Sequence, residues 1–150
     1  MNLRDKLTED LKQTIRQGDE LGRSTLRLVM AAIKNAEIEK RRELGEGELL
    51  AIIAKEAKQR RESIAQFERG DRQDLADREK AELQILLAYL PEQLSREAIE
   101  AQARQIIEEI GAASLAQMGQ VMRRLMPLMQ GKADGKLVNQ VVKELLAGKT

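Results

Sequence analysis

Residues 111–146 read GAASLAQMGQVMRRLMPLMQGKADGKLVNQVVKELL. Apolar residues recur at spacings of three and four on both sides of GKADGK (residues 131–136), which predicts two short helices joined by a tight turn. Asp134 is placed to cap the second helix. Pro127 is expected to kink or shorten the first helix, because proline removes one donor from the hydrogen-bond ladder. The stretch therefore predicts a small helical unit built around a basic turn.

Positive charge is concentrated in this last part of the chain. From Gly111 to the C-terminus there are six Lys and Arg residues against two acidic ones, a net charge of +4. Residues 1–90 carry 18 basic and 18 acidic side chains, and residues 91–110 have a net charge of −3. Local fields guide the choice of partner more than the total charge does, so the C-terminal unit is expected to bind a polyanion. The six cations are Arg123, Arg124, Lys132, Lys136, Lys143 and Lys149.

The composition favours an all-α protein and excludes several kinds of chemistry. Of the 150 residues, 42% are hydrophobic, yet there is one Phe, one Tyr and no Trp, so the core must be aliphatic. The abundant Leu, Ala, Glu, Lys, Arg and Gln are good helix formers. The chain has no Cys and no His, which removes Ser-His and Cys-His nucleophilic catalysis and the commonest metal ligands. We expect no metal, no cofactor, no signal peptide and no membrane partner, and the missing Cys suggests the reducing cytoplasm.

Apolar stripes and Gly/Pro residues divide the chain into a helical domain of about four helices (1–90) and a three-helix tail domain (91–150). Leu90-Pro91 is the strongest boundary, because the residue before proline is disfavoured in helical conformation. The linker 91–94 offers few apolar anchors and is expected to act as a joint. The expected stripes are Leu3/Leu7/Leu11/Ile15; Leu26/Val29/Met30/Ile33/Ala36 in a helix from Ser24; Leu49/Ile53/Ala57/Ile64/Phe67; Leu75/Leu83/Leu86/Leu87/Leu90; Ile99/Ala103/Ile106/Ile110, capped by Ser95; Met118/Met122/Leu125/Met129; and Leu137/Val138/Val141/Val142/Leu145.

The GKADGK turn is not a nucleotide-binding P-loop. Only three residues separate Gly131 from Gly135, Leu137 replaces the Ser/Thr that would bind Mg²⁺, and no strand precedes the turn. Two interpretations of the turn stay open. It holds one phosphate of a polymer through backbone N–H groups and Lys side chains, or it is purely structural.

Several other features have an ordinary structural interpretation. The carboxylate pairs Glu37/Glu39, Glu79/Glu82 and Glu108/Glu109 are interpreted as solvated helix faces, and the methionine stripe as packed core. Gly119 inside a helix is expected to mark a close helix–helix approach. The basic clusters Lys40–Arg42 and Lys55–Arg61 are either solvated faces or further phosphate contacts.

The final helix predicts a cationic outer stripe. With Leu137, Val141 and Leu145 facing inward, Lys136, Gln140 and Lys143 lie on the opposite side. Scarce aromatic residues argue against base stacking, so contacts are expected with RNA backbone and shape. The candidate RNA-binding residues are Arg123, Arg124, Lys132, Lys136 and Lys143.

MGQVMRRLMPLMQGKADGKLVNQVVKELL (118–146) resembles the C-terminal tail shared by the YqeY family and the GatB subunit of the tRNA-dependent amidotransferases. STLRLVMAAIKNAEIEKRREL (24–44), KEAKQRRESIAQFERGDRQDLADREKAEL (55–83) and YLPEQLS (89–95) resemble the matching parts of free-standing YqeY proteins.

This resemblance implies a helical module whose tail touches the outer corner of tRNA. In the amidotransferases the catalytic cradle lies upstream of the module, and the family-level label is carbon-nitrogen ligase with glutamine as amido-N-donor. The resemblance therefore implies a tRNA-binding accessory module without its own active site, acting with an amidotransferase or another translation-related protein. The alternative is a helical protein-interaction adaptor that binds no RNA.

Overall fold

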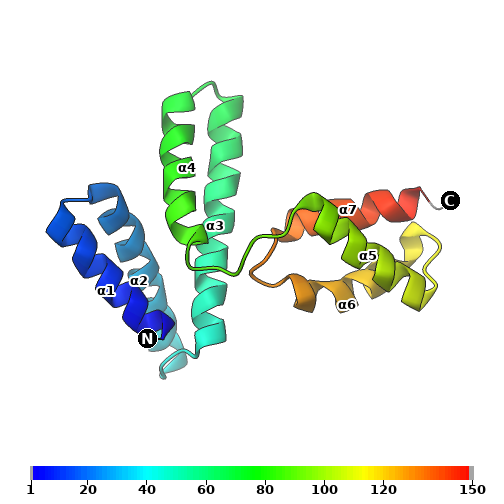
Figure 1. Cartoon of the computed structure of the whole chain (residues 1–150), viewed down its shortest axis with the longest axis horizontal. Helices are drawn as coiled ribbons and strands as arrows, with labels where there is room; N and C mark the ends of the chain where they lie inside the picture. The colour runs from blue at the N-terminus through cyan, green and yellow to red at the C-terminus, as the bar shows by residue number, and fades with distance from the viewer. Residues whose placement is uncertain (1, 149–150) are drawn as a thin grey trace. The chain divides into compact units, whose positions relative to one another are not determined.

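The computed structural model describes residues 2–148, which form seven α-helices, one short 3-10 helix and no β-strand (Figure 1). The predicted all-α class is confirmed. No helix in this described range is both long enough and apolar enough to span a bilayer. The elements are α1 (Leu3–Gln17), α2 (Glu20–Lys40), α3 (Glu46–Arg69), α4 (Gln73–Leu87), α5 (Arg96–Ile110), the 3-10 helix η1 (Leu115–Gln117), α6 (Met118–Met129) and α7 (Gly135–Ala147).

The chain divides into two compact units, Met1–Pro91 and Glu92–Thr150. Helices α1–α4 fall in the first unit, and α5–α7 with η1 fall in the second. Each unit has an apolar core of its own.

Short polar side chains begin several of the helices. Asn2, Asp19, Ser95 and Asp134 each accept a hydrogen bond from a backbone N–H in the first turn of α1, α2, α5 and α7, which satisfies a donor that the helix leaves unpaired. The predicted caps Ser95 and Asp134 are therefore confirmed. The second helix was expected to begin at Ser24, but Asp19 starts it four residues earlier, at Glu20.

The first unit packs α1 on α2 and α3 on α4, and α2 also contacts α3 and α4 (Figure 1). The predicted stripe on α1 is correct for Leu3, Leu7 and Leu11, which is partly buried against the core, and wrong for Ile15. Leu3 and Leu7 are buried, but Ile15 is 51% exposed and Thr14 takes the inner position. A strict spacing of four drifts by about 40° per step around a helix of 3.6 residues per turn, so the stripe leaves the core face. The core of this unit is Leu3, Leu7, Leu26, Val29, Ile33, Leu44, Leu49, Ile53, Ala57 and Leu86.

The second unit packs α5, α6 and α7 pairwise around a core of aliphatic residues and Met129. Met118, Met122 and Met126 are partly buried against this core, so the methionine stripe is packed core as predicted. The prediction for Gly119 is wrong, because a Cβ built there meets nothing within 4 Å. Its core residues are Ile99, Ala103, Ile106, Ile107, Ala112, Val121, Leu125, Met129, Val138, Val141, Val142 and Leu146.

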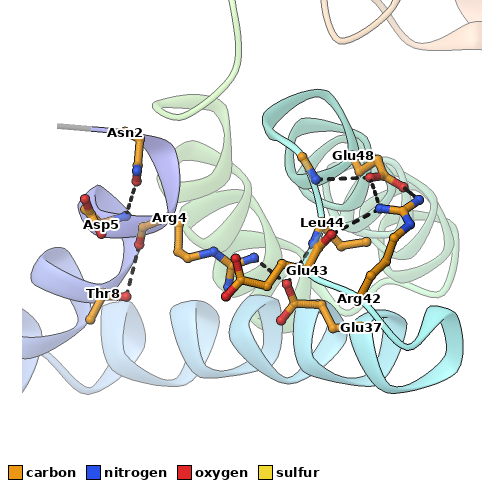
Figure 2. A network of polar contacts seen from close by, with 10 residues as sticks. Asn2, Arg4, Asp5, Thr8, Glu37, Arg42, Glu43, Leu44 and Glu48 are labelled. Carbon is orange, nitrogen blue, oxygen red and sulfur yellow. Dashed lines mark hydrogen bonds and ion pairs between the residues drawn. The ribbon is translucent and has the colours of Figure 1, made fainter.

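Two carboxylates hold the loop between α2 and α3 (Figure 2). Glu37 accepts hydrogen bonds from the Arg4 guanidinium and from the backbone N–H of Leu44, at 2.9 Å for the latter. Glu48 accepts from Lys40 at 2.8 Å, from Arg42 at 2.8 and 2.9 Å, and from the backbone N–H of Gly45 at 3.0 Å. The loop is thus fixed from both ends.

The same hydrogen bonds change the acidity of both groups. Arg42, followed by Lys40 and the Gly45 N–H, lowers the pKa of Glu48 far below its ordinary value. The Leu44 N–H, followed by Arg4, lowers the pKa of Glu37. A carboxyl whose folded-state pKa is lowered stabilises the fold above its unfolded pKa, near 4.3, and this contribution is lost as the pH falls through the folded value.

Replacing Glu48 with Gln should therefore lower the melting temperature at pH 7 and flatten the loss of stability below about pH 4.3. Circular dichroism melts between pH 7 and pH 2.5 measure both effects. Glu43→Gln is the matched control, because Glu43 enters this network through its backbone carbonyl, which the substitution keeps. Equal melting curves for the two variants would contradict the prediction.

Candidate nucleic-acid interface

The five candidate RNA-binding residues lie on α6, on the turn that follows it and on α7. Arg123 and Arg124 belong to α6, Lys132 to the turn, and Lys136 and Lys143 to α7, and all five are exposed. Lys149, counted above in the local charge, lies outside the described residues.

Backbone hydrogen bonds fix the shape of the basic turn. Gly131 adopts a left-handed conformation with φ of 74°, which favours glycine. The N–H groups of Lys132 and Ala133 both donate to the carbonyl of Met129, at 2.8 and 3.2 Å. The turn therefore carries the Lys132 side chain on a backbone that is fixed by hydrogen bonds.

Residues that precede α5 hold this turn from outside. The backbone N–H of Leu94 donates to the carbonyl of Lys132 at 2.9 Å, and the Gln93 side chain donates to the carbonyl of Gly131 at 2.8 Å. Leu94 also packs against the core of the second unit. The linker 91–94 was expected to offer few apolar anchors; Leu94 is one, and Gln93 adds a polar contact that was not foreseen.

The first turn of α7 is occupied by a carboxylate of the chain itself. Asp134 accepts from the backbone N–H of Lys136 at 3.3 Å, and the N–H groups of Lys132 and Ala133 already have partners. A fixed negative charge at this helix end disfavours a phosphate in the same place. The geometry thus favours contact through lysine side chains over a phosphate cradled by backbone N–H groups.

The two arginines of α6 point to different neighbours. Arg124 forms an ion pair of 2.7 Å with Glu109 of α5. Met126, one turn after Arg123, lies beside Gly135, since its Cε would be 3.7 Å from a Cβ at that position. Arg124 therefore lies toward α5, and Arg123, three residues before Met126, lies nearer to the α7 side of α6 than Arg124 does.

The outer stripe of α7 is exposed as predicted. Lys136, Gln140 and Lys143 are exposed, while Val138, Val141 and Val142 are buried on the opposite side. Glu144 is paired with Arg96 of α5. Hydrogen bonds from Gln140 and then from Arg96 lower the pKa of Glu144. This acid is drawn toward α5, which leaves cations at both ends of the stripe.

Several cations of the two alternative basic clusters in the first unit are paired with acids of the chain. Lys40 and Arg42 both pair with Glu48, at 2.8 Å each. In the second cluster, Arg60 is only 8% exposed and is paired with Glu56, Glu79 and Glu82. Neither cluster presents its full charge to a polyanion.

Arg60 is the site that sequence reasoning missed. It was assigned to a solvated face, as were Glu79 and Glu82, and both assignments are wrong. Arg60 lies 3.3 Å from Glu56, 3.3 Å from Glu82 and 3.8 Å from Glu79, and all four side chains are mostly buried. Within residues 2–148, no three His, Cys, Asp or Glu side chains are grouped so as to hold a metal ion.

Comparison with protein families agrees with this fold and these motifs. The family model described as Yqey-like protein matches residues 4–146. The chain belongs to the YqeY family. The resemblance seen in the sequence motifs is therefore confirmed over nearly the whole chain.

Relatives of this YqeY-family chain carry the name Altered inheritance of mitochondria protein 41, mitochondrial. The Kluyveromyces lactis protein is 39% identical over 108 residues, which cover 69% of the chain and 58% of that protein. The Pyrenophora tritici-repentis protein is 27% identical over 147 residues, 96% of the chain and 81% of the relative. The alignment with the Vanderwaltozyma polyspora protein covers only 46% of it, so the chain spans about half the length of several curated relatives.

The prediction of a cytoplasmic location is wrong on this comparison. The relatives from Kluyveromyces lactis, Pyrenophora tritici-repentis and Saccharomyces cerevisiae are all named mitochondrial proteins. The missing cysteines, on which the prediction rested, fit any reducing compartment and do not single out the cytoplasm.

Removing the Arg60 guanidinium should destabilise this YqeY-family fold strongly. Arg60→Met leaves buried carboxylates without their counter-ion, which typically costs about 3–5 kcal/mol. Burial and the charge of Glu82 already raise the pKa of Glu79 while Arg60 opposes this, so loss of the guanidinium raises that pKa further. The loss in the free energy of unfolding should therefore be larger at pH 7 than at pH 4. Urea unfolding at both pH values measures it.

Two further variants test the cause. Adding Glu79→Gln and Glu82→Gln to Arg60→Met should restore part of the stability at pH 7. Arg69→Met, at an exposed position of the same helix, should change stability by less than about 0.5 kcal/mol. A loss at Arg60 that is small or independent of pH would contradict the assignment.

Proposed function

We propose that this chain is a non-catalytic tRNA-binding accessory module. The observation that carries the proposal is that Arg123 of α6, Lys132 of the fixed turn, and Lys136 and Lys143 of α7 are all exposed. Membership of the YqeY family and the resemblance of residues 118–146 to the tail of the amidotransferase GatB subunit support tRNA as the polyanion. An amidotransferase or another translation-related protein is the proposed functional partner. The carbon-nitrogen ligase label then describes the reaction that such a partner performs.

The charges support contact with the RNA backbone rather than with bases. A lysine beside a phosphate displaces a condensed counterion, so affinity falls as salt rises, by about 0.9 units of log K per log unit of salt for each phosphate contacted. Four such cations predict a slope of roughly −3 to −4. Arg124 is expected to contribute less, because Glu109 already neutralises it.

Reversing three of these charges should abolish most of the binding. In Lys132→Glu/Lys136→Glu/Lys143→Glu, affinity for tRNA at low salt should fall by more than about tenfold, and the salt slope should become shallower. Filter binding or gel shifts at two or more salt concentrations measure both quantities. The matched control is Lys12→Glu/Arg27→Glu/Lys34→Glu, which changes the net charge equally at exposed positions of the first unit.

Equal losses in the two triple variants would reduce the effect to net charge and contradict this face. Absence of binding by the parent chain at low salt would favour the protein-interaction adaptor. Glutamine hydrolysis or amidation of Glu-tRNA by the purified chain would contradict the non-catalytic part of the proposal.

We also propose that residues 1–90 and 91–150 are independent domains joined at Pro91. Tyr89 and Leu90 pack with the core of the first unit, while Gln93 is bonded to the basic turn and Leu94 packs with the core of the second unit, so the joint is confined to residues 91 and 92. The Tyr89 hydroxyl donates to Asp10 at 2.5 Å, which secures the first side of the joint.

Residual dipolar couplings of the full chain should then give a different alignment tensor for each unit, because two bodies on a short flexible joint orient separately. Substituting Pro91 with Ala should leave two tensors, since the separation rests on the two cores. A single tensor that fits both units would contradict the proposal.

A further inference from the structure

A groove of about 630 Å³ opens in the first unit between α2 and the α3–α4 pair. This volume lies within the range of about 300–1,000 Å³ that is typical of ligand pockets. Leu28 from α2, Phe67 from α3 and Leu75 from α4 form its apolar surface, and its polar surface comes from Gln59, Arg60, Ser63, Arg78, Glu79 and Glu82. The groove is thus amphipathic and combines aliphatic and aromatic walls with carboxylates.

Leu28 is the unusual member of the wall. It is 54% exposed, although α2 buries Leu26 and Val29 on its inner side. Covering an exposed aliphatic side chain with a second apolar group stabilises the complex by about 25 cal/mol per Å² of apolar surface removed from water. The groove therefore favours an occupant with an apolar part.

The carboxylates are not fully neutralised by the cations of the fold. Arg60 lies within 4 Å of Glu56, Glu79 and Glu82, so one guanidinium serves three carboxylates. Arg78 adds an ion pair to Glu82 at 3.7 Å from a side chain that is 67% exposed. Of the three carboxylates, Glu79 has the weakest pairing, because it lies 3.8 Å from the Arg60 guanidinium, which is too far for a hydrogen bond.

The pKa of Glu79 agrees with this incomplete neutralisation. Burial, followed by the negative charge of Glu82, raises the pKa of Glu79. A cation that paired with Glu79 would offset the repulsion from Glu82. The groove belongs to the first unit, whereas the α6–α7 face belongs to the second.

We propose that this groove binds a protein segment, helical when bound, that carries an aliphatic side chain one turn away from a lysine or arginine. The aliphatic group packs between Leu28 and Phe67, and the cation pairs with Glu79. A helix presents residues four apart on one face, which matches a groove with apolar walls beside a carboxylate. The first unit would thereby recruit a basic amphipathic partner while the second unit binds another ligand.

The test is a methyl NMR titration of the full-length chain with a defined probe. The probe is a 15-residue amidated alanine-based helical peptide with one Leu and a Lys four residues later. The methyl signals of Leu28 and Leu75 should shift with saturation at millimolar peptide or below. Peptides with Lys changed to Glu, or Leu changed to Ser, should shift them at least about fivefold less, since each loses one of the two contacts.

Variants of the chain locate the contact. Glu79→Gln and Leu28→Ser should each weaken the peptide by about fivefold to tenfold, because they remove one charge-assisted bond or one apolar contact. Ile38→Ser is the matched control. Ile38 is also on α2 and is 65% exposed, but it is not part of the groove. Circular dichroism confirms that each variant keeps its helices.

The outcomes separate the alternatives. Saturable shifts that need both Leu and Lys, and that fall in the groove variants alone, support the proposal. No shift at millimolar peptide, or equal shifts with the Glu-containing peptide, overturns it. Concentration-dependent association of the chain that Leu28→Ser abolishes also overturns it and assigns the groove to a second copy.

Discussion

A guanidinium that is shielded from water must keep its carboxylate partners, and Arg60 imposes this condition on the α3–α4 pair. Desolvating a charged group costs several kcal/mol unless partners compensate. Glu56 compensates from the preceding turn of α3, and Glu79 and Glu82 compensate from one face of α4. The ionic group therefore fixes which residues of the two helices face each other. The wall of the groove that includes Phe67 and Leu75 takes its position from the same pairing.

Much of the fold could be predicted from short-range signals. Ser95 and Asp134 cap their helices, and Gly111 ends α5 in a left-handed conformation. Each of these rests on backbone geometry within a few residues, where the sequence is informative. The stripe of α1 failed at Ile15 because the angular drift accumulated over three steps of four residues. The start of α2 was missed because Asp19 was not considered as a cap. The clamp of Gln93 and Leu94 on the GKADGK turn joins residues 38 positions apart, so no local pattern indicated it.

The ionic cluster was missed for a different reason. Residues 55–62 are so rich in charge that they look like a solvated face, and composition hides the one position that points inward. A signal was present, since Arg60 continues the stripe Leu49–Ile53–Ala57 at a spacing of three, just as Glu79 and Glu82 fall between Leu75 and Leu86. Two charged interruptions of opposite sign in two neighbouring apolar stripes indicate a buried ion pair. The location of the candidate RNA residues was predicted better, because exposure on α7 follows directly from its apolar face. The difference between Arg124, which is paired, and Arg123 could not be predicted, since it depends on Glu109 of another helix.

The hydrogen bonds from Gln93 and Leu94 to the turn also have a mechanical consequence. Tension applied through the chain at Glu92 would reach the carbonyls of Gly131 and Lys132 before it reached the body of α5. These two hydrogen bonds are the first contacts with the rest of the unit along that path, so the turn is placed to respond early to a pull. Lys132 lies in this turn. A pull on the linker would therefore change the presentation of this lysine while the three helices kept their packing.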